Sequence, residues 1–337
     1  MTIPETLGQM LLFGWDVSGN EYKVNDHAIS LIDDMGAGGI VLEERNITAP
    51  RSLRVILEEL QVRARSCGLP HLFVAVDQEG GALSRLRPPY FPETRTAAEI
   101  GVAADPRQAR AEARTVGLEL KKHGFNLNLA PVLDVLSGAD NTVIGDRSYG
   151  SDPTNVAAMG VAATRGFQED AGIMACGKHF PGHGAGDDTL LHGLHIQPHS
   201  EKQLREIDLV PFRAAITAGI EAIMVSHLMV PAVDDQLPAT MSYHFMTGVL
   251  RHELGFEGLI VVDCMEAANG FTLAGMEDKV AGAVLAGADI IFCCHEQDTQ
   301  IDVHNALFTA VESGHIPLSR IDESLARIAR AKERWVA

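Results

Sequence analysis

The chain has 337 residues, of which 46% are hydrophobic and 21% charged, a balance that excludes disorder as the main state and provides enough apolar material for a large core. Its formal net charge of -18 repels phosphate backbones and anionic lipids, so we expect neither a nucleic-acid nor a membrane partner. The first basic residue is Lys23, no apolar run approaches the ~20 residues that span a bilayer, and the cysteines are odd in number and scattered. These features predict a cytoplasmic protein with reduced thiols.

Eight short apolar segments rich in β-branched residues recur along the chain and are typical of buried strands. They are residues 11–15, 39–43, 72–77, 127–131, 174–180, 222–227, 259–263 and 289–293. Amphipathic segments with helical spacing lie between them. These are residues 51–66, 106–122, 155–170, 201–218 and 298–313.

This alternation predicts an α/β fold, and specifically a single (β/α)8 TIM-type barrel. Parallel strands that are buried on both faces have continuous apolar sequences, and eight such units close well into a barrel. Residues 318–335 indicate an additional C-terminal helix, which we expect to pack across the barrel. Because no linker, repeat or low-complexity tract divides the chain, we expect residues 1–337 to form one domain.

Ionisable residues stand at or just after the ends of six predicted strands. They are Asp77, Asp134, the pair Lys178–His179, His227, Asp263 and His295. Active sites of barrels lie at the C-terminal edge of the strands. We therefore expect these side chains to converge on one rim.

Residues 177–184 (GKHFPGHG) are the most informative stretch, because Lys178, His179 and His183 lead from a strand into a Gly/Pro-rich loop. A mobile, backbone-rich loop of this kind can approach a ligand closely. The alternative is a turn with solvated polar residues. We favour a binding role, since a Lys-His pair at the end of a buried strand is costly without partners.

A zinc site is the competing interpretation of this loop. His179 and His183 have the four-residue spacing of helical metal ligands, and residues 192–199 hold three further histidines. Pro181 and Gly182 would break the helix that puts the first pair on one face, and the later spacings match no common zinc pattern. We therefore predict no metal site.

Asp263 ends the apolar segment 258–263, where a rigid strand could hold a carboxylate nucleophile in place. Its structural alternative is a helix N-cap. Asp77, in the stretch VDQEGG at 76–81, has the same ambiguity, with a tight Gly-Gly turn as the alternative. The glycines at 36–39 lack the dinucleotide fingerprint, so we predict no nucleotide cofactor.

Six stretches together resemble glycoside hydrolase family 3, especially its single-barrel bacterial β-N-acetylglucosaminidases. They are residues 75–81 (AVDQEGG), 129–135 (LAPVLDV), 143–149 (VIGDRSY), 177–184 (GKHFPGHG), 208–213 (DLVPFR) and 261–265 (VVDCM). The resemblance implies a barrel without a cofactor that cleaves a small-molecule β-glycoside by double displacement, with retained configuration.

By this resemblance, Asp263 matches the nucleophile that forms a covalent glycosyl-enzyme. Five further residues match positions that hold the hydroxyl groups of the terminal sugar: Asp77, Arg85, Arg147, Lys178 and His179. From their positions at the rim, we expect His183 and His227 to contribute to substrate binding as well.

The chain departs from the family at the catalytic acid/base. In the acetylglucosaminidase branch an Asp-x-His dyad follows the PGHG segment, but the ungapped positions here are residues 189–191 (TLL). The nearest substitute is His192, with Asp188 as an orienting carboxylate; His195 and Asp187 are alternatives. An imidazole near its unperturbed pKa can protonate a leaving group and later accept a proton.

A retaining enzyme also needs an acceptor to open the glycosyl-enzyme, and water requires a general base, whereas phosphate does not. Histidines tolerate the phosphate charge better than a carboxylate does, and the backbone at 182–186 could donate N–H groups to it. We therefore predict a retaining β-glycoside phosphorylase for terminal β-glucosyl or β-N-acetylglucosaminyl units, with inorganic phosphate as co-substrate. The alternatives are an exo-acting retaining β-N-acetylglucosaminidase or β-glucosidase, a metal-dependent barrel hydrolase, and a catalytically silent sugar-binding protein.

Overall fold

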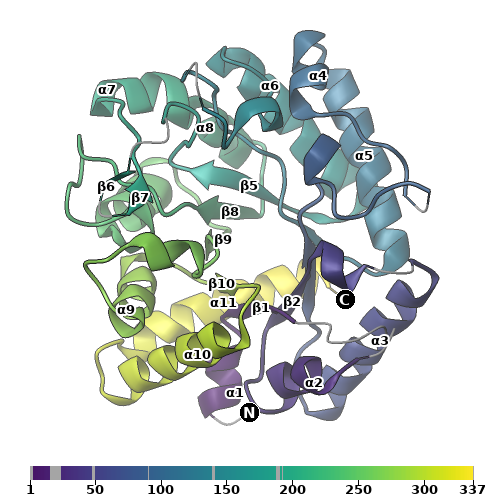
Figure 1. Cartoon of the computed structure of the whole chain (residues 1–337), viewed down its shortest axis with the longest axis vertical. Coiled ribbons are helices and arrows are strands. Elements are labelled where there is room, and N and C mark those ends of the chain that lie inside the picture. Colours follow the sequence, from purple (N-terminus) through teal and green to yellow (C-terminus); the bar gives the residue numbers. More distant parts are fainter. Residues whose placement is uncertain are drawn as a thin grey trace.

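The computed structural model describes residues 3–15, 24–47, 50–89, 91–138, 141–186, 190–191 and 193–336. At its centre is an eight-stranded sheet whose neighbours all pair in parallel, in the order β10-β1-β2-β3-β4-β5-β8-β9 (Figure 1). The strands are β1 (Leu11–Gly14), β2 (Gly39–Leu42), β3 (Phe73–Val76), β4 (Leu127–Asn128), β5 (Met174–Phe180), β8 (Ala222–Val225), β9 (Leu259–Val262) and β10 (Ile291–Cys293). Between β9 and β10, the Val262 N–H donates to the Ile290 carbonyl at 3.0 Å, which closes the sheet. The predicted (β/α)8 barrel is confirmed.

Helices surround this barrel (Figure 1). They are α1 (Ile3–Gly8), α2 (Asp26–Asp33), α3 (Pro50–Ser66), α4 (Ala97–Val102), α5 (Pro106–His123), α6 (Pro153–Arg165), α7 (Glu201–Gln203), α8 (Leu209–Thr217), α9 (Met276–Ala286), α10 (Gln297–Glu312) and α11 (Leu318–Trp335). Three π-helical segments, Gly166–Ala171, Leu204–Asp208 and His244–Glu253, extend or connect them. Among the helices described, none combines the length and the apolarity needed to span a bilayer.

Local sequence sets the limits of the long helix α5. The Asp105 side chain accepts a hydrogen bond from the Arg107 N–H, and Pro106 occupies the first turn, where its missing N–H has no consequence. The helix ends at Gly124, whose φ of 100° is accessible to glycine at little cost. Asp152 and Pro153 start α6 in the same way.

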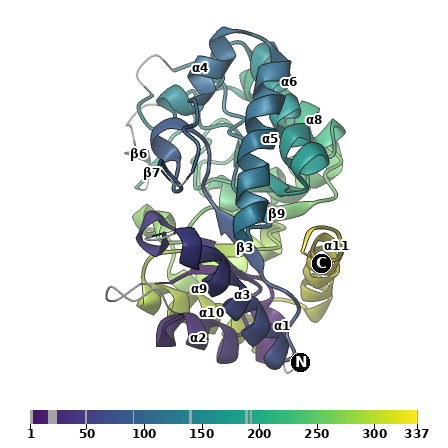
Figure 2. The same cartoon turned by 90° about the vertical axis from the view of Figure 1, so that its right-hand side faces the viewer.

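The C-terminal helix α11 packs across the N-terminal end of the barrel, as predicted. Lys332 Nζ donates to Gln9 Oε1 at 2.7 Å, just before β1, and Arg320 Nη2 donates to the Ala288 carbonyl at 2.8 Å, before β10. Figure 2 shows α11 on the opposite side of the barrel from the loops around β6 (Leu190–Leu191) and β7 (Leu194–His195). The C-terminal rim, at that other end, is thus left uncovered by α11.

Strands β6 and β7 form an antiparallel hairpin that the sequence did not indicate. Each has only two residues, which is too short for a visible alternation of apolar and polar side chains. Leu194 packs with Met229 and Phe271 in a small apolar cluster, and Leu191 lies against it. Leu191 occupies the position that the family pattern gives to a histidine, so this position now contributes to packing.

Candidate active site

A cavity of about 270 Å³ opens at the C-terminal ends of the strands. Its ionisable and thiol lining comes from Glu43, Asp77, Glu79, Arg85, Arg147, Lys178, His179, His183, Asp263, Cys264, Cys294 and His295. The structure therefore brings seven of the predicted site residues together: Asp263, Asp77, Arg85, Arg147, Lys178, His179 and His183. The size is near the lower end of the ~300–1,000 Å³ range of small-molecule pockets, which suits a ligand of one or two rings.

Asp263 follows β9 directly and is partly buried in the cavity wall. The Cys264 N–H donates to its Oδ1 at 2.7 Å, and Ser226 Oγ donates to its Oδ2 at 3.2 Å. Burial favours a raised pKa for this carboxyl, but nearby imidazole and lysine charges and the Cys264 N–H outweigh it and hold the pKa below its ordinary value. Among the described residues, Asp263 has no ion-pair partner. A fixed, ionised and unpaired carboxylate in a cavity has the properties of a nucleophile.

Lys178, Asp77, Glu79 and Arg147 form a charged network on the facing wall. Lys178 Nζ contacts Asp77 Oδ1 and lies 2.6 Å from Glu79 Oε1. Arg147 holds Glu79 with two parallel bonds, Nε to Oε2 at 2.8 Å and Nη2 to Oε1 at 2.9 Å. Burial opposes ionisation of Glu79, but the two cations outweigh it and lower its pKa. The network fixes donors and acceptors that can bind sugar hydroxyls.

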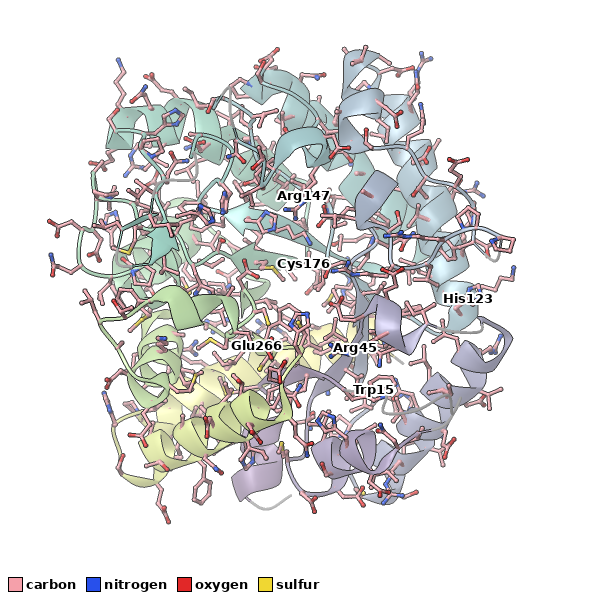
Figure 3. The ribbon with its side chains drawn as sticks, viewed as in Figure 1. Trp15, Arg45, His123, Arg147, Cys176 and Glu266 are labelled. Atoms are coloured by element: carbon pink, nitrogen blue, oxygen red, sulfur yellow. The ribbon has the colours of Figure 1, made fainter. Side chains whose placement is uncertain are left out.

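Arg85 lies at another part of the cavity wall, where its Nε is 3.0 Å from Glu43 Oε2. Burial raises the pKa of Glu43, and the Arg85 charge opposes that shift only in part. The lining residues stand at or after the ends of several separate strands, β3, β5, β9 and β10 among them, as is usual for a barrel enzyme. Figure 3 shows Arg147 and Glu266 on opposite sides of Cys176.

Buried Asp134 organises the loop that contains His179 and His183. It accepts from His179 Nδ1 at 2.7 Å and from the His183 N–H at 2.6 Å. Arg147 Nη2 lies 3.2 Å from His179 Nε2, so the two contacts specify the tautomer with the proton on Nδ1. This arrangement orients the imidazole toward the charged network.

The prediction of a mobile loop at 177–184 was wrong, because these residues are buried and tightly packed. A Cβ added at Gly184 would lie 2.0 Å from the Val135 carbonyl oxygen. The Gly182 N–H already donates to the His179 carbonyl, and the His183 N–H to Asp134. These two donors are therefore not free for the phosphate contact that the sequence suggested.

His183 lines the cavity, and its ring centre lies 5.4 Å from that of His195 in β7. Burial lowers the pKa of His183 and favours the neutral imidazole. Within the described part of the chain, its Nδ1 has no hydrogen-bond partner. His183 is thus a neutral group with an available nitrogen beside the cavity.

His227 lies behind Asp263 and does not line the cavity. Its Nε2 donates to the Asp263 carbonyl at 3.1 Å, and its Nδ1 pairs with Thr240 Oγ1 at 2.8 Å. Burial lowers the pKa of this histidine. Its geometry fits a positioning role at the Asp263 backbone better than contact with a ligand.

The predicted acid/base His192 and its partner Asp188 lie outside the described residues, as does the alternative Asp187. The other alternative, His195, is described and stands next to His183. Among the described residues, the histidines of this region form no group of three metal ligands. The zinc alternative based on these histidines therefore gains no support.

Glu79, Glu43 and the cysteines at this rim were not predicted as site residues from the sequence. Glu79 lies two positions after Asp77 in the stretch 76–81. Only Asp77, the carboxylate at the strand end, was predicted to belong to the site. The thiols of Cys264 and Cys294 lie 3.3 Å apart, although they are 30 residues apart in the chain. The sequence offered one signal for this contact: each cysteine follows one of the last two strands, β9 or β10, within two residues.

Comparison with known proteins agrees with this geometry. Residues 2–331 match the glycosyl hydrolase family 3 N-terminal domain. A beta-hexosaminidase from Thiobacillus denitrificans is 35% identical over 308 residues, covering 88% of this chain and 81% of its own. A family 3 β-N-acetylglucosaminidase structure from Paenibacillus has a TM-score of 0.94 and 38% identity, covering 99% of this chain, which spans 62% of that enzyme. A β-N-acetylhexosaminidase structure from Beutenbergia cavernae has a TM-score of 0.88 and 28% identity over 99% of both chains.

These relatives support an enzyme that cleaves β-glycosides. Their names describe hexosaminidases and acetylglucosaminidases. The comparisons thus favour the hydrolase alternative over the phosphorylase that the sequence analysis preferred, and they give no support to transfer onto phosphate.

Proposed function

This chain belongs to glycosyl hydrolase family 3, and on that premise we propose that it is an exo-acting retaining β-N-acetylglucosaminidase. The observation that carries the proposal is the Asp263 carboxylate, which the Cys264 N–H and the Ser226 hydroxyl orient in the cavity. The names of the relatives favour the N-acetylglucosaminyl unit over the glucosyl unit.

In the first step, an Asp263 oxygen attacks C1 of the sugar and the bond from C1 to the leaving oxygen breaks, while that oxygen takes a proton from the acid/base. In the second step, water attacks C1, its proton passes to the same group, and the bond between Asp263 and C1 breaks. The network of Lys178, Asp77 and Arg147 holds the sugar hydroxyls through both steps. Because donors and acceptors are already fixed by ion pairs, they need little reorganisation during the reaction.

His192, with Asp188, is the proposed acid/base. The support comes from its neighbours in the chain: Leu191 and Leu194 pair in the β6–β7 hairpin, and His195 stands against cavity-lining His183. The described neighbour His195 is therefore close to the cavity. An imidazole in this role replaces the dyad of the acetylglucosaminidase branch.

The deciding assay compares p-nitrophenyl β-N-acetylglucosaminide with p-nitrophenyl β-glucoside, each with and without inorganic phosphate. We expect the N-acetylglucosaminide to react faster, free sugar to be the product, and the rate to be independent of phosphate. A phosphate-dependent rate with sugar 1-phosphate as product would overturn hydrolysis and restore the phosphorylase.

A second measurement tests the nucleophile. The mechanism-based inactivator 5-fluoro-N-acetylglucosaminyl fluoride should add one sugar mass to the protein, on the peptide that contains Asp263. Attachment at another carboxylate, or inactivation without added mass, would remove Asp263 from the proposed role.

His192→Ala should reduce hydrolysis of a poor leaving group such as a methyl glycoside much more than that of the p-nitrophenyl substrate, which needs little protonation. His315→Ala is the matched control, because His315 is exposed and does not line the cavity. Equal losses on both substrates would assign the proton transfer to another group.

A further inference from the structure

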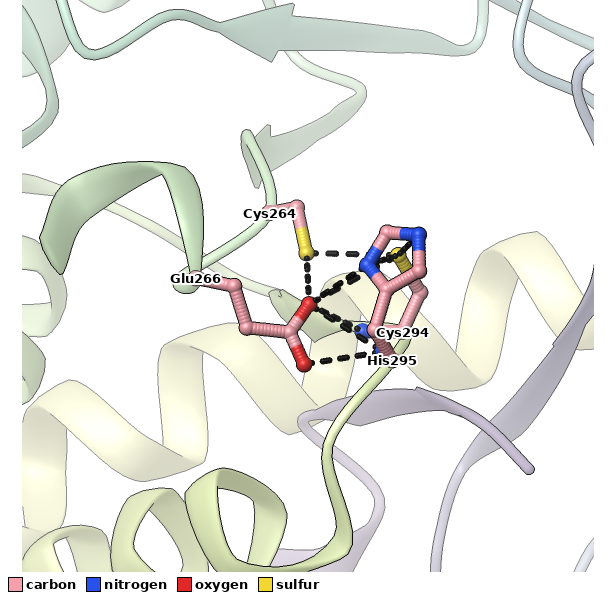
Figure 4. A group of neighbouring side chains, drawn as sticks. All are labelled: Cys264, Glu266, Cys294 and His295. Carbon is pink, nitrogen blue, oxygen red and sulfur yellow. Dashed lines mark hydrogen bonds and ion pairs between the residues drawn. The ribbon is translucent and has the colours of Figure 1, made fainter. Parts of the chain in front are cut away.

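A cluster of two thiols, an imidazole and a carboxylate borders the cavity beside the proposed nucleophile. It consists of Cys264, Glu266, Cys294 and His295 (Figure 4), with one donor atom from each lying within 4.8 Å of all the others. Cys264 and Glu266 follow β9, and Cys294 and His295 follow the neighbouring β10. The cysteines are buried and His295 is half exposed, so an ion can reach the cluster from the cavity side.

We propose that these four side chains bind one Zn²⁺ ion. Two thiolates with an imidazole or a carboxylate are the ligand types that zinc prefers in proteins. Without a metal, the hydrogen bonds within the cluster contribute little stability, because a thiol is a weak donor and a weak acceptor. The residues come from two adjacent, paired strand ends, which hold them at a fixed separation.

The separations agree with a tetrahedral site after a small expansion. The Cys264 and Cys294 sulfurs are 3.3 Å apart, Cys294 Sγ is 3.0 Å from His295 Nδ1, and His295 Nδ1 is 2.8 Å from Glu266 Oε2. Zinc bonds of about 2.3 Å to sulfur and about 2.0–2.1 Å to nitrogen and oxygen put neighbouring tetrahedral donors about 3.3–3.8 Å apart. Each of these pairs must therefore separate by about 0.5 Å, and Cys264 Sγ and Glu266 Oε2, which lie 2.8 Å apart, by about 0.7 Å.

Backbone groups already orient the Glu266 carboxylate. Its Oε1 accepts from the Glu296 N–H at 2.6 Å and from the His295 N–H at 2.8 Å. Its Oε2 faces the thiols and the imidazole and also accepts from the His295 and Cys294 N–H groups, at 3.1 and 3.3 Å. The backbone thus fixes the carboxylate with Oε2 directed at the cluster. This is the usual arrangement around a ligating carboxylate.

The binding step releases protons to solvent. Zn²⁺ forms bonds to both sulfurs, and the two thiol protons leave; His295 Nδ1, which lies 2.8 Å from Glu266 Oε2, must give up its proton as well before it can bind the ion. The site then carries two positive charges from zinc and three negative charges from the two thiolates and Glu266.

The zinc would also fix the backbone at Cys264, whose N–H donates to Asp263 Oδ1 at 2.7 Å. This positioning effect rests on the proposed function, whereas zinc binding does not. The two can be tested separately, since metal content is measured without substrate.

The test uses the full-length chain, reduced, stripped with a chelator and then titrated with Zn²⁺ or Co²⁺. We expect one equivalent of zinc per chain, a higher melting temperature with zinc, and, with cobalt, the thiolate charge-transfer absorption and intense visible bands of a tetrahedral site. Cys294→Ser should weaken zinc affinity by more than the about 10–100-fold that loss of a second-shell partner costs.

Cys67→Ser is the matched control, because Cys67 is an exposed thiol outside the cluster, and it should bind zinc like the wild type. His295→Ala, which removes a half-exposed side chain, keeps the test decisive if the buried cysteine variant fails to fold, and it should also weaken binding. Equal zinc affinity in wild type and His295→Ala, or a cobalt spectrum without the thiolate band, would overturn the proposal.

Discussion

Buried charges lie at both ends of the barrel, but their surroundings differ. At the N-terminal end, Asp289 is fully buried; Arg251 pairs with its Oδ2, and Arg327 and Arg320 lie 3.1 and 3.5 Å from its Oδ1. Two of those arginines belong to α11, which covers this end. At the C-terminal rim, Lys178, Glu79 and Arg147 are paired just as closely, but they face a cavity of about 270 Å³. Similar ion pairing is thus enclosed where a helix covers it, and lines a cavity where the loops leave space.

We call the C-terminal rim, with its cavity, the open end of the barrel. The largest effect is expected there, from removal of the Asp263 carboxylate, which has no ion-pair partner among the described residues. Asp263→Asn keeps the size of the side chain but replaces an anionic oxygen, so kcat should fall at least about 1,000-fold while the melting temperature stays close to that of the wild type. Steady-state kinetics and calorimetry measure the two quantities. Activity within tenfold of the wild type would show that the nucleophile lies elsewhere.

At the N-terminal end, which α11 covers and which we call the closed end, a substitution should lower stability and leave the kinetics unchanged. Asp289→Asn leaves three arginines without their shared anion, and breaking such a buried pairing costs about 3–5 kcal/mol of unfolding free energy. Urea denaturation measures that loss. KM of the folded enzyme should be unchanged, because Asp289 lies at the other end of the strands. A loss below about 1 kcal/mol would mean that the charges at this end are solvated and that the contrast between the ends is false.

The fold was largely readable from the sequence, because strands buried on both faces must be continuously apolar. All eight strands of the barrel sheet were predicted, and β5 was predicted with its observed bounds, Met174–Phe180. Helices α1, α2, α4 and α9 were not identified. The closure between β9 and β10 and the role of Asp289 depend on packing between distant segments, which periodicity does not encode.

Part of the candidate site could be predicted from the sequence. Strand-end position predicted the convergence of Asp77, Lys178, His179 and Asp263, since parallel strands deliver such residues to one rim. The pairing of Arg147 with Glu79 required the loop geometry, and so did the position of His227 behind the cavity. Cysteines that are scattered in sequence gave no sign that Cys264 and Cys294 meet.

A conservative change of arginine sharpens the comparison between the two ends. Arg147→Lys keeps the charge but loses the two-bond contact with Glu79 and the contact with His179. We expect kcat/KM to fall about 10–100-fold, because lysine cannot reproduce the planar fork. The matched change at the closed end, Arg320→Lys, should lower the melting temperature and leave kcat/KM unchanged. Similar kinetic losses in both variants would contradict separate roles.

The smallest expected effect concerns Lys332, a buried lysine at the closed end. Its Nζ donates to Gln9 Oε1, and burial lowers its pKa to about 7. Since the unfolded chain keeps the ordinary lysine pKa of about 10.4, it binds more protons than the folded chain between these values, and the lysine makes stability rise with pH across that window. This pKa difference corresponds to about 4 kcal/mol near pH 7, and loss of the hydrogen bond to Gln9 offsets about 1–3 kcal/mol of it. Lys332→Met should therefore stabilise the protein by about 1–2 kcal/mol near pH 7, and the gain should shrink and then reverse toward pH 10.

Urea denaturation of both proteins from pH 7 to pH 10 measures this difference, and Lys202→Met, at an exposed position, controls for loss of a lysine in general. A difference that stays constant with pH would show that Lys332 is charged in the folded protein throughout. In that case its ammonium group would be stabilised by Gln9 and by the Phe73 ring, whose centre lies 5.2 Å away. The closed end would then hold a permanently charged lysine in addition to its three arginines, as the open end holds Lys178 in addition to Arg147, and the two ends would differ in the space they leave and not in how they stabilise charge.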